Sequence, residues 1–290
     1  MRFYIVDAFT DKIFDGNPAG VVLIDNDKNF PQDDIMQKTA AELRYSETAF
    51  VYQNNTDEFT IRYFTPKGEV DLCGHATIAA FSVLVKEGII SLDTQCFNNT
   101  KAGRLNIIAG NEIMMQMAEP QLLKTLNDQT ILQNLYSIMG ADYSTQRSEY
   151  LPYIISTGLA DIIMPIRNAE ILNSLKPDMV ALSSFSEHMK VVGVHAFSLE
   201  QDDDFTAHVR NFAPLFGIDE ESATGTANGA LTYWLYLNNM LKNGDKCNFL
   251  QGEAMMRPSI ITTQLSILND KCNISVGGKA VILAQGEIFI

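Results

Sequence analysis

One string of residues occurs twice in the chain and constrains the fold more than any other feature. Arg-x-Phe-x-Pro begins at Arg62 and again at Arg210, and Gly-x-Ala follows each copy, at Gly74 and at Gly225. The Arg, Phe and Pro positions lie 148 residues apart and the Gly and Ala positions 151 apart, so a three-residue insertion relates the two segments. A pattern repeated in register indicates internal duplication. We therefore predict two homologous halves; the alternative is two unrelated strand–loop–helix junctions.

The helix expected after each Gly-x-Ala is apolar on nearly all sides. These helices are predicted over residues 74–86 and 225–241, with Gly244 as the C-cap of the second. A helix without a polar face lies either in a membrane or inside a protein. The longest strongly apolar stretch, 76–85, has half of the roughly 20 residues that a membrane span needs. We therefore expect a sheet to surround each helix.

The remaining pattern mixes short strands with a few helices. Helices are expected over 31–43 and 130–139, and residues 66–72 are expected to form a loop. Residues 177–184 and 191–199 are read as continuing a strand–turn–strand unit. Strands are expected near 3–8, 20–24, 47–51, 59–64, 105–108, 112–117, 153–156, 161–165 and 205–212.

Composition excludes several classes of protein. The chain has 290 residues, 46% of them hydrophobic, and a formal net charge of -14. That charge repels phosphate backbones and anionic membrane surfaces, so we expect neither nucleic acid nor a membrane as a partner. The segment 1–7 lacks the apolar core of a signal peptide, and the four cysteines form no Cys-x-x-Cys pair. A cytoplasmic protein with reduced thiols is predicted.

Three side chains could transfer protons. Glu47 stands between a helix and an apolar strand, where a raised pKa would suit acid/base catalysis; the alternative is a surface acid that ends the helix. His75 follows Gly74 and could shuttle a proton, although a lone histidine is often structural. Cys73 precedes Gly74 and could be an acidic thiol at a helix N-terminus, whereas its counterpart in the second half is Thr224. No metal-ligand spacing is found, so no metal is expected.

The two helix entrances suggest how a ligand is held. The first N–H groups of a helix are unpaired and the helix dipole is positive there, so both entrances favour an anion, above all a carboxylate. Glycine at Gly74 and Gly225 would let a ligand approach the backbone. The alternative is that both glycines only permit close packing. Duplicated domains commonly bind small ligands between them, and we expect the active site there.

Five motifs together resemble the PhzF-like phenazine biosynthesis family of the diaminopimelate epimerase-like superfamily. They are Gly16-Asn17-Pro18-Ala19, Ser46-Glu47-Thr48-Ala49-Phe50, Arg62-Tyr63-Phe64-Thr65-Pro66, Leu72-Cys73-Gly74-His75-Ala76-Thr77 and 223–230, in order along essentially the whole chain. The resemblance implies a duplicated two-domain α+β fold, each domain a β-barrel-like roll around a central helix. The expected domains are 1–118 with a C-terminal strand at about 280–290, and 119–279. Members are homodimers that use no cofactor and isomerise by moving a proton.

The resemblance also assigns roles to residues. The catalytic glutamate falls on Glu47, and His75 and Glu221 are expected to assist it. The substrate-binding positions implied are Asn17, Cys73, Gly74, Thr224, Gly225 and Thr226.

Two of these positions depart from the family pattern. Glu221-Ser222 stands where aspartate and proline are usual, and Thr226 replaces serine. Both changes reshape the pocket.

The function expected is a cofactor-independent isomerase that moves a proton on a small carboxylated metabolite, with Glu47 as general acid/base. Two alternatives stay open. One is a thiol-dependent epimerase, racemase or dehydratase that uses Cys73, although Thr224 argues against a mechanism with two thiols. The other is a non-catalytic metabolite-binding protein, which the altered motif at Glu221 allows.

Overall fold

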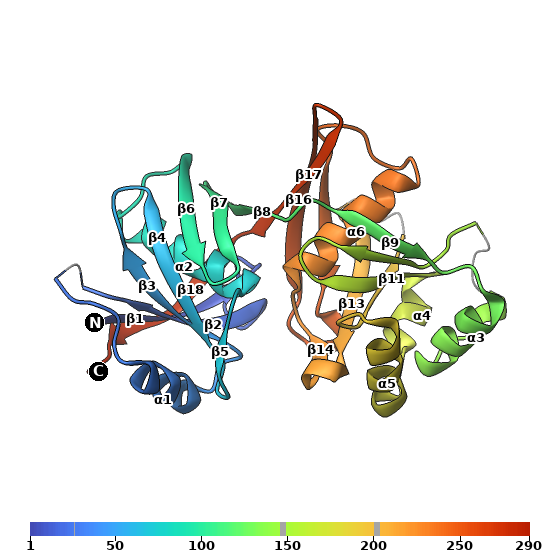
Figure 1. The fold of residues 1–290 in the computed structure, drawn as a ribbon, viewed down its shortest axis with the longest axis horizontal. Helices are drawn as coiled ribbons and strands as arrows, with labels where there is room; N and C mark the ends of the chain where they lie inside the picture. The colour runs from blue at the N-terminus through green and yellow to red at the C-terminus, as the bar shows by residue number, and fades with distance from the viewer. Residues whose placement is uncertain (26, 146–148, 200–203) are drawn as a thin grey trace. The chain divides into compact units, whose positions relative to one another are not determined.

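A computed structural model describes residues 1–25, 27–145, 149–199 and 204–290 of the chain. The chain divides into two compact units, Met1–Gln116 with Gly277–Ile290, and Met117–Val276. Each unit has its own strands and its own buried helix (Figure 1). Within the described residues no helix is long and apolar enough to cross a membrane.

The first unit builds its sheet around helix α2 (Gly74–Lys86). Helix α1 (Asp33–Leu43) connects two parallel strands, β2 and β3. The strands are β1 (Arg2–Ala8), β2 (Asn17–Leu23), β3 (Thr48–Gln53), β4 (Glu58–Phe64), β5 (Glu69–Val70), β6 (Thr94–Thr100), β7 (Gly103–Ala109), β8 (Ile113–Gln116) and β18 (Ala280–Glu287).

The second unit repeats this plan around helix α6 (Gly225–Leu237). Its strands are β9 (Gln121–Thr125), β10 (Tyr153–Ser156), β11 (Ala160–Ile166), β12 (Val194–Ser198), β13 (Ala207–Ala213), β14 (Ile218–Glu221), β15 (Lys246–Gln251), β16 (Ser259–Leu268) and β17 (Lys271–Gly278), whose last residues return to the first unit. The other helices are α3 (Gln129–Ile138), α4 (Ala169–Ser174) and α5 (Met179–Met189), with short 3-10 turns at Tyr143–Thr145, Pro214–Phe216 and Glu253–Met255.

The strand order confirms the predicted duplication. In the first unit, β1–β2 is antiparallel, β2–β3 parallel, β3–β4 antiparallel and β4–β6 parallel. The second unit has the same series in β10–β11, β11–β12, β12–β13 and β13–β15. A short strand pairs with the end of β4 in one unit and of β13 in the other. The two copies of the repeated string therefore occupy equivalent strands.

Strands β4 and β13 pack against other elements on both sides. Neighbouring residues of a strand point to opposite faces, and in these two strands both faces bury side chains. Phe64 packs with Met36 and Ala40 of α1, whereas its neighbour Tyr63 bonds to Thr77 of α2. In the second unit, Phe212 belongs to the core with α3–α5, and Val209 to the core around Trp234 of α6. The expectation that a sheet surrounds α2 and α6 is confirmed.

Three local predictions are wrong. Residues 177–184, read as part of a strand unit, begin α5, because the Asp178 carboxylate caps Val180 and Ala181 and an apolar face with Leu182 and Phe185 follows. Helix α6 ends at Leu237, so Gly244 is not its C-cap but lies in a left-handed turn before β15. The loop predicted over 66–72 contains the short strand β5.

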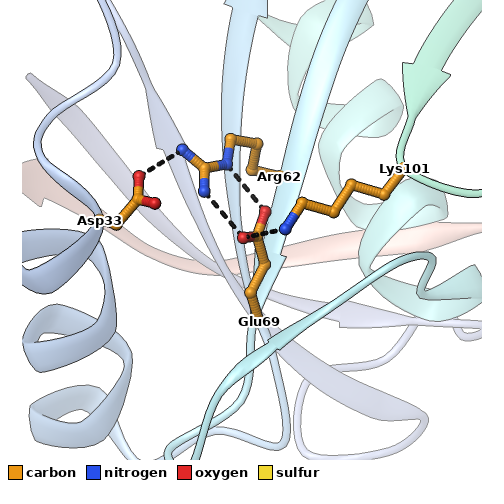
Figure 2. A network of polar contacts seen from close by, with 4 residues as sticks. All are labelled: Asp33, Arg62, Glu69 and Lys101. Carbon is orange, nitrogen blue, oxygen red and sulfur yellow. Dashed lines mark hydrogen bonds and ion pairs between the residues drawn. The ribbon is translucent and has the colours of Figure 1, made fainter.

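The repeated arginines form ion pairs with glutamates of the short strands, β5 in the first unit and β14 in the second. Arg62 forms two hydrogen bonds to the Glu69 carboxylate, of 2.8 and 2.7 Å, and a third to Asp33 of α1; Lys101 also contacts Glu69 (Figure 2). Its guanidinium lies 5.3 Å from the ring of Phe64, at cation–π distance. Arg62 and Phe64 of the repeated Arg-x-Phe-x-Pro string therefore have a structural role in the first unit.

Arg210 makes the same arrangement in the second unit. It binds Glu220 through two bonds of 2.8 Å, stacks 4.9 Å from Phe212 and donates to the backbone carbonyls of Leu172, Asn173 and Leu175. Glu69 and Glu220 are 151 residues apart, like the glycines. The three-residue insertion in the second half therefore lies between Pro214 and Glu220. The 3-10 turn Pro214–Phe216 begins in this segment.

Candidate active site

Three side chains meet at the entrance of α2. Glu47 directly precedes β3, and its backbone carbonyl accepts a hydrogen bond of 3.1 Å from the N–H of Gly20 in β2. Cys73 is the extended residue before α2, and His75 is the second residue of the helix. The parallel pairing of β2 with β3 thus places Glu47 beside a helix that begins 27 positions later in the chain.

The His75 ring is the centre of this group. Its Nε2 lies 3.2 Å from Glu47 Oε2 and 3.1 Å from Ser46 Oγ. Its Nδ1 lies 3.3 Å from the Asn17 amide nitrogen and 3.4 Å from Cys73 Sγ. The ring is 5% exposed and the Glu47 side chain 17% exposed, so the carboxylate is the more accessible partner.

The pKa of Glu47 contradicts the prediction from the sequence. Burial alone would raise the pKa of this carboxyl, as we expected, but the contacts with His75, Ser46 and Cys73 outweigh burial and lower it. Burial would lower the pKa of His75, and its contacts with Cys73 and Glu47 instead hold that pKa well above the ordinary value. Both shifts favour a carboxylate beside an imidazolium; within the described residues Glu47 Oε2 makes no hydrogen bond, so its contact with His75 is an ion pair.

Cys73 differs from the acidic thiol that its position suggested. Burial and the negative charge of Glu47 raise its pKa to about 11, despite the opposing effect of His75. At neutral pH the side chain is a thiol, which is a weak nucleophile and a weak base. Of the two side chains, Glu47 is therefore the better proton acceptor at neutral pH.

In the part of the chain that the structure describes, the entrances of α2 and α6 lack a side-chain cap, as does that of α1, whereas α3, α4 and α5 each have one. Asp128, Asn168 and Asp178 cap α3, α4 and α5 through side-chain oxygens. Within the described residues no side-chain oxygen caps α2 or α6. Their first N–H groups keep the capacity to bind an anion.

Close packing does not explain the two entrance glycines. A Cβ at Gly74 would lie 3.7 Å from Met115, and one at Gly225 would lie 3.6 Å from Val276. Both distances are ordinary van der Waals contacts, and neither glycine has a positive φ. The protein itself therefore tolerates a side chain at these positions.

In the second unit, Glu221 and Thr224 share one hydrogen-bond network. The Thr224 hydroxyl donates to Glu221 Oε2 at 2.6 Å. Gln251 Nε2 donates to the Glu221 carbonyl and to Thr224 Oγ1, and its oxygen accepts from Asn228 and from the Thr224 N–H. Thr226 is half-buried, and its carbonyl accepts a hydrogen bond from Thr157. Gln251 and Asn228 thus support the α6 entrance.

The first unit has a matching support. Thr77, which corresponds to Asn228, donates to the carbonyl of Cys73, as Asn228 does to that of Thr224. Tyr63 and Asn98 complete this buried network. We predicted none of these supporting roles from the sequence; the 151-residue offset between Thr77 and Asn228 was the available signal.

The two units differ at the position of Glu47. The N–H of Gly20 binds the carbonyl of Glu47, and the equivalent N–H of Ile162 binds the carbonyl of Gly193. The second half therefore has glycine where the first has Glu47, and a Cβ at Gly193 would lie only 1.8 Å from the Phe212 carbonyl oxygen. This position cannot accommodate a second base without movement of the backbone.

The predicted site residues fall into two groups. The structure brings together Asn17, Glu47, Cys73, Gly74 and His75 in the first unit. The second unit holds the other group, Glu221, Thr224, Gly225 and Thr226. Although the sequence shows no metal-ligand spacing, the ligand atoms of Glu47, Cys73 and His75 all lie within 4.8 Å of one another.

The duplicated fold, with a helix enclosed by strands in each half, belongs to the diaminopimelate epimerase-like class. A hydroxyproline epimerase from Agrobacterium vitis shares it, with a TM-score of 0.64 at 12% identity over 99% of this chain and 90% of that chain. The family model described as phenazine biosynthesis-like protein (PhzC-PhzF) matches residues 6–286, and the chain belongs to this family.

Two further comparisons agree with this assignment. An uncharacterized isomerase of Clostridium acetobutylicum is 32% identical, over 100% of this chain and 98% of that protein. A Bacillus anthracis PhzF-family crystal structure matches with a TM-score of 0.88 and 26% identity, over 100% of this chain and 99% of that chain. The chain is an isomerase of the PhzF type.

Proposed function

We propose that the protein is a cofactor-independent isomerase that moves a proton on a small carboxylated metabolite, with Glu47 as the general acid/base. The observation that carries the proposal is the contact of 3.2 Å between Glu47 Oε2 and His75 Nε2. A carboxylate held ionised beside a buried imidazolium is in the form that accepts a proton, and its lowered pKa makes it a weaker base than a carboxylate with a raised pKa. The homodimer that the resemblance implies is also proposed, and sedimentation equilibrium would test it.

The proposed reaction conserves protons. The Glu47 carboxylate removes a proton from a carbon of the substrate, and the electron pair left on the substrate is delocalised. The Glu47 carboxylic acid then returns that proton to another carbon or to the other face. Because Glu47 becomes neutral in the first step, the positive charge of His75 is left to stabilise the anionic intermediate.

Backbone N–H groups are proposed to hold the substrate carboxylate. The entrance of α2 offers backbone N–H groups at Gly74, next to the proposed base, and within the described residues no side-chain oxygen caps it. In the second unit, the Gly225–Thr226 entrance of α6 is proposed to bind the same class of group, with Glu221 assisting or orienting. Asn17, Cys73 and Thr224 complete the proposed set.

Gly74→Ala should separate ligand binding from folding. The added methyl has only an ordinary contact with Met115, so we expect the free energy of unfolding to change by less than about 1 kcal/mol. The same methyl should obstruct the approach of a carboxylate and raise KM by about 10-fold, which is about 1.4 kcal/mol. Steady-state kinetics and urea unfolding measure the two effects. Gly68→Ala, in a loop where a Cβ meets nothing within 4 Å, is the control and should leave both unchanged.

The decisive experiment follows exchange of substrate protons with solvent. Small amino and cyclic carboxylates are incubated in heavy water with the protein, and deuterium incorporation is measured by NMR and mass spectrometry. Glu47→Gln preserves the shape of the side chain and removes the base, so incorporation should fall by at least about 10²-fold. Glu42→Gln, an exposed acid in α1, should behave as wild type. Undiminished exchange by Glu47→Gln would rule out Glu47 as the base.

The same assay decides between the remaining alternatives. A thiol-dependent enzyme would lose exchange in Cys73→Ala and keep it in Glu47→Gln. A non-catalytic binding protein would bind a carboxylate without catalysing exchange. The pKa of about 11 at Cys73 favours the glutamate mechanism over the thiol one.

A further inference from the structure

The α2 entrance combines three kinds of metal ligand. A thiol, an imidazole and a carboxylate, from Cys73, His75 and Glu47, have their ligand atoms within 4.8 Å of one another. It is the one such set of three within the described ranges of the chain. The proposed proton transfer uses the carboxylate and the imidazolium, and it does not require chemistry at the sulfur.

The distances in this group match the edges of a zinc tetrahedron. Zinc binds sulfur at about 2.3 Å and nitrogen or oxygen at about 2.0–2.1 Å, so tetrahedral ligands lie about 3.6 Å (sulfur to nitrogen) and about 3.4 Å (nitrogen to oxygen) apart. The corresponding separations here are 3.8 Å, from Cys73 Sγ to His75 Nε2, and 3.2 Å, from His75 Nε2 to Glu47 Oε2. The third pair, the Cys73 sulfur and the Glu47 carboxylate oxygen, lies within 4.8 Å, so side-chain movement that closes this separation completes the set.

We propose that Zn²⁺ binds reversibly to Cys73 Sγ, His75 Nε2 and Glu47 Oε2 and thereby blocks the isomerase site. When the zinc bonds form, the Cys73 thiol and the His75 ring each release a proton to solvent. The thiolate and the carboxylate then neutralise the two charges of the ion, which makes its burial between side chains that are 5–17% exposed favourable. Water completes the coordination. The blocking of activity rests on the proposed function, whereas the metal binding does not.

The surroundings of the group suit this arrangement. A metal-bound imidazole donates its other ring N–H to an acceptor, and a half-turn of the Asn17 amide, whose nitrogen lies 3.3 Å from Nδ1, would present its oxygen there. The second unit has Gly193, Thr224 and Thr226 at the equivalent positions. Because none of these three offers a sulfur, imidazole or carboxylate ligand, one ion per chain is expected.

Cobalt titration of the untagged protein tests the site. Co²⁺ is the probe because a thiolate ligand produces an intense near-ultraviolet charge-transfer band that Zn²⁺ then removes on displacement. Wild type should develop the band with one equivalent of Co²⁺. Cys73→Ala should lack it, while Cys272→Ala, which removes a half-buried thiol elsewhere, should keep it. His75→Gln and Glu47→Gln should each weaken Co²⁺ binding by at least 10-fold.

Three results would overturn the proposal: no band in wild type, an undiminished band in Cys73→Ala, or unchanged affinity in both His75→Gln and Glu47→Gln. Circular dichroism checks that each variant is folded, and Cys73→Ser replaces Cys73→Ala if the latter is not. The experiments distinguish failure of the zinc site from failure of Glu47 as the general base. If Glu47→Gln keeps proton exchange but loses cobalt affinity, the metal site stands and the role of Glu47 as base falls.

Discussion

Replacing Arg210 with alanine is expected to lower the free energy of unfolding of the second unit by about 3–5 kcal/mol. The Arg210 side chain is 9% exposed and that of its partner Glu220 is 16% exposed. The substitution leaves the Glu220 carboxylate without its cation and three backbone carbonyls, at residues 172, 173 and 175, without their donor. A buried charge and buried acceptors that lose their partners are costly, because little water reaches them.

The equivalent substitution in the first unit is a matched comparison. Arg62→Ala should cost less, about 1–3 kcal/mol, because Glu69 keeps Lys101 as a cationic partner and Asp33 is exposed. The protein has one tryptophan, Trp234, which is buried in the second unit. Its fluorescence therefore reports urea unfolding of that unit, and circular dichroism follows both. Equal losses in the two variants would show that burial of Arg210 does not decide the cost.

The ion pair of Arg210 with Glu220 also shows which features the sequence could predict and which it could not. The repeat of Arg210 and Arg62 was visible, and so was the start of both helices, because apolar residues predominate in the stretch after each entrance glycine. Glu220 and Glu69 share the 151-residue offset of those glycines. Comparing the halves residue by residue would therefore have predicted that each repeated arginine pairs with a glutamate. The capping residue Asp178 was likewise a helix signal within a segment read as strand.

Predicting the candidate site required long-range contacts that no local sequence pattern shows. Glu47 lies against His75 because β2 and β3 are parallel and Gly20 binds the Glu47 carbonyl. The charge state of Glu47 follows from that contact, so a prediction from burial alone had the wrong sign. The presence of Gly193 at the position equivalent to Glu47 also emerged only from equivalent strand pairing. These features are long-range, whereas the helix entrances are encoded within a few residues.

Asp161→Asn is the second substitution with a large expected effect, and its effect should depend on pH. Burial and the negative charge of Glu221 raise the pKa of Asp161 from 3.8 to about 7, against a weaker opposing hydrogen bond from the Gly193 backbone. The side chain is 2% exposed, and within the described residues its Oδ1 has no hydrogen-bond partner. The folded protein therefore holds this proton at a pH where the unfolded chain has released it.

The sign of the pH dependence follows from that difference. Between about pH 4 and pH 7 the folded state binds more protons than the unfolded state, so the contribution of Asp161 to stability falls as pH rises. At about 1.4 kcal/mol per pKa unit, the rise from 3.8 to about 7 corresponds to a loss on the order of 4 kcal/mol by pH 8. An asparagine cannot ionise, so it should avoid most of this loss.

We expect Asp161→Asn to be more stable than wild type by about 1–3 kcal/mol at pH 8, because the new amide hydrogens lack acceptors and reduce the gain. At pH 4 the advantage should disappear. Urea unfolding followed by Trp234 fluorescence at both pH values measures the difference, since Asp161 and Trp234 lie in the same unit. The control is Asp219→Asn, which replaces an exposed acid in β14. Its free energy of unfolding should differ little from that of wild type at either pH. Equal destabilisation of Asp161→Asn at both values would mean that Asp161 is ionised in the folded protein and that another group holds its charge.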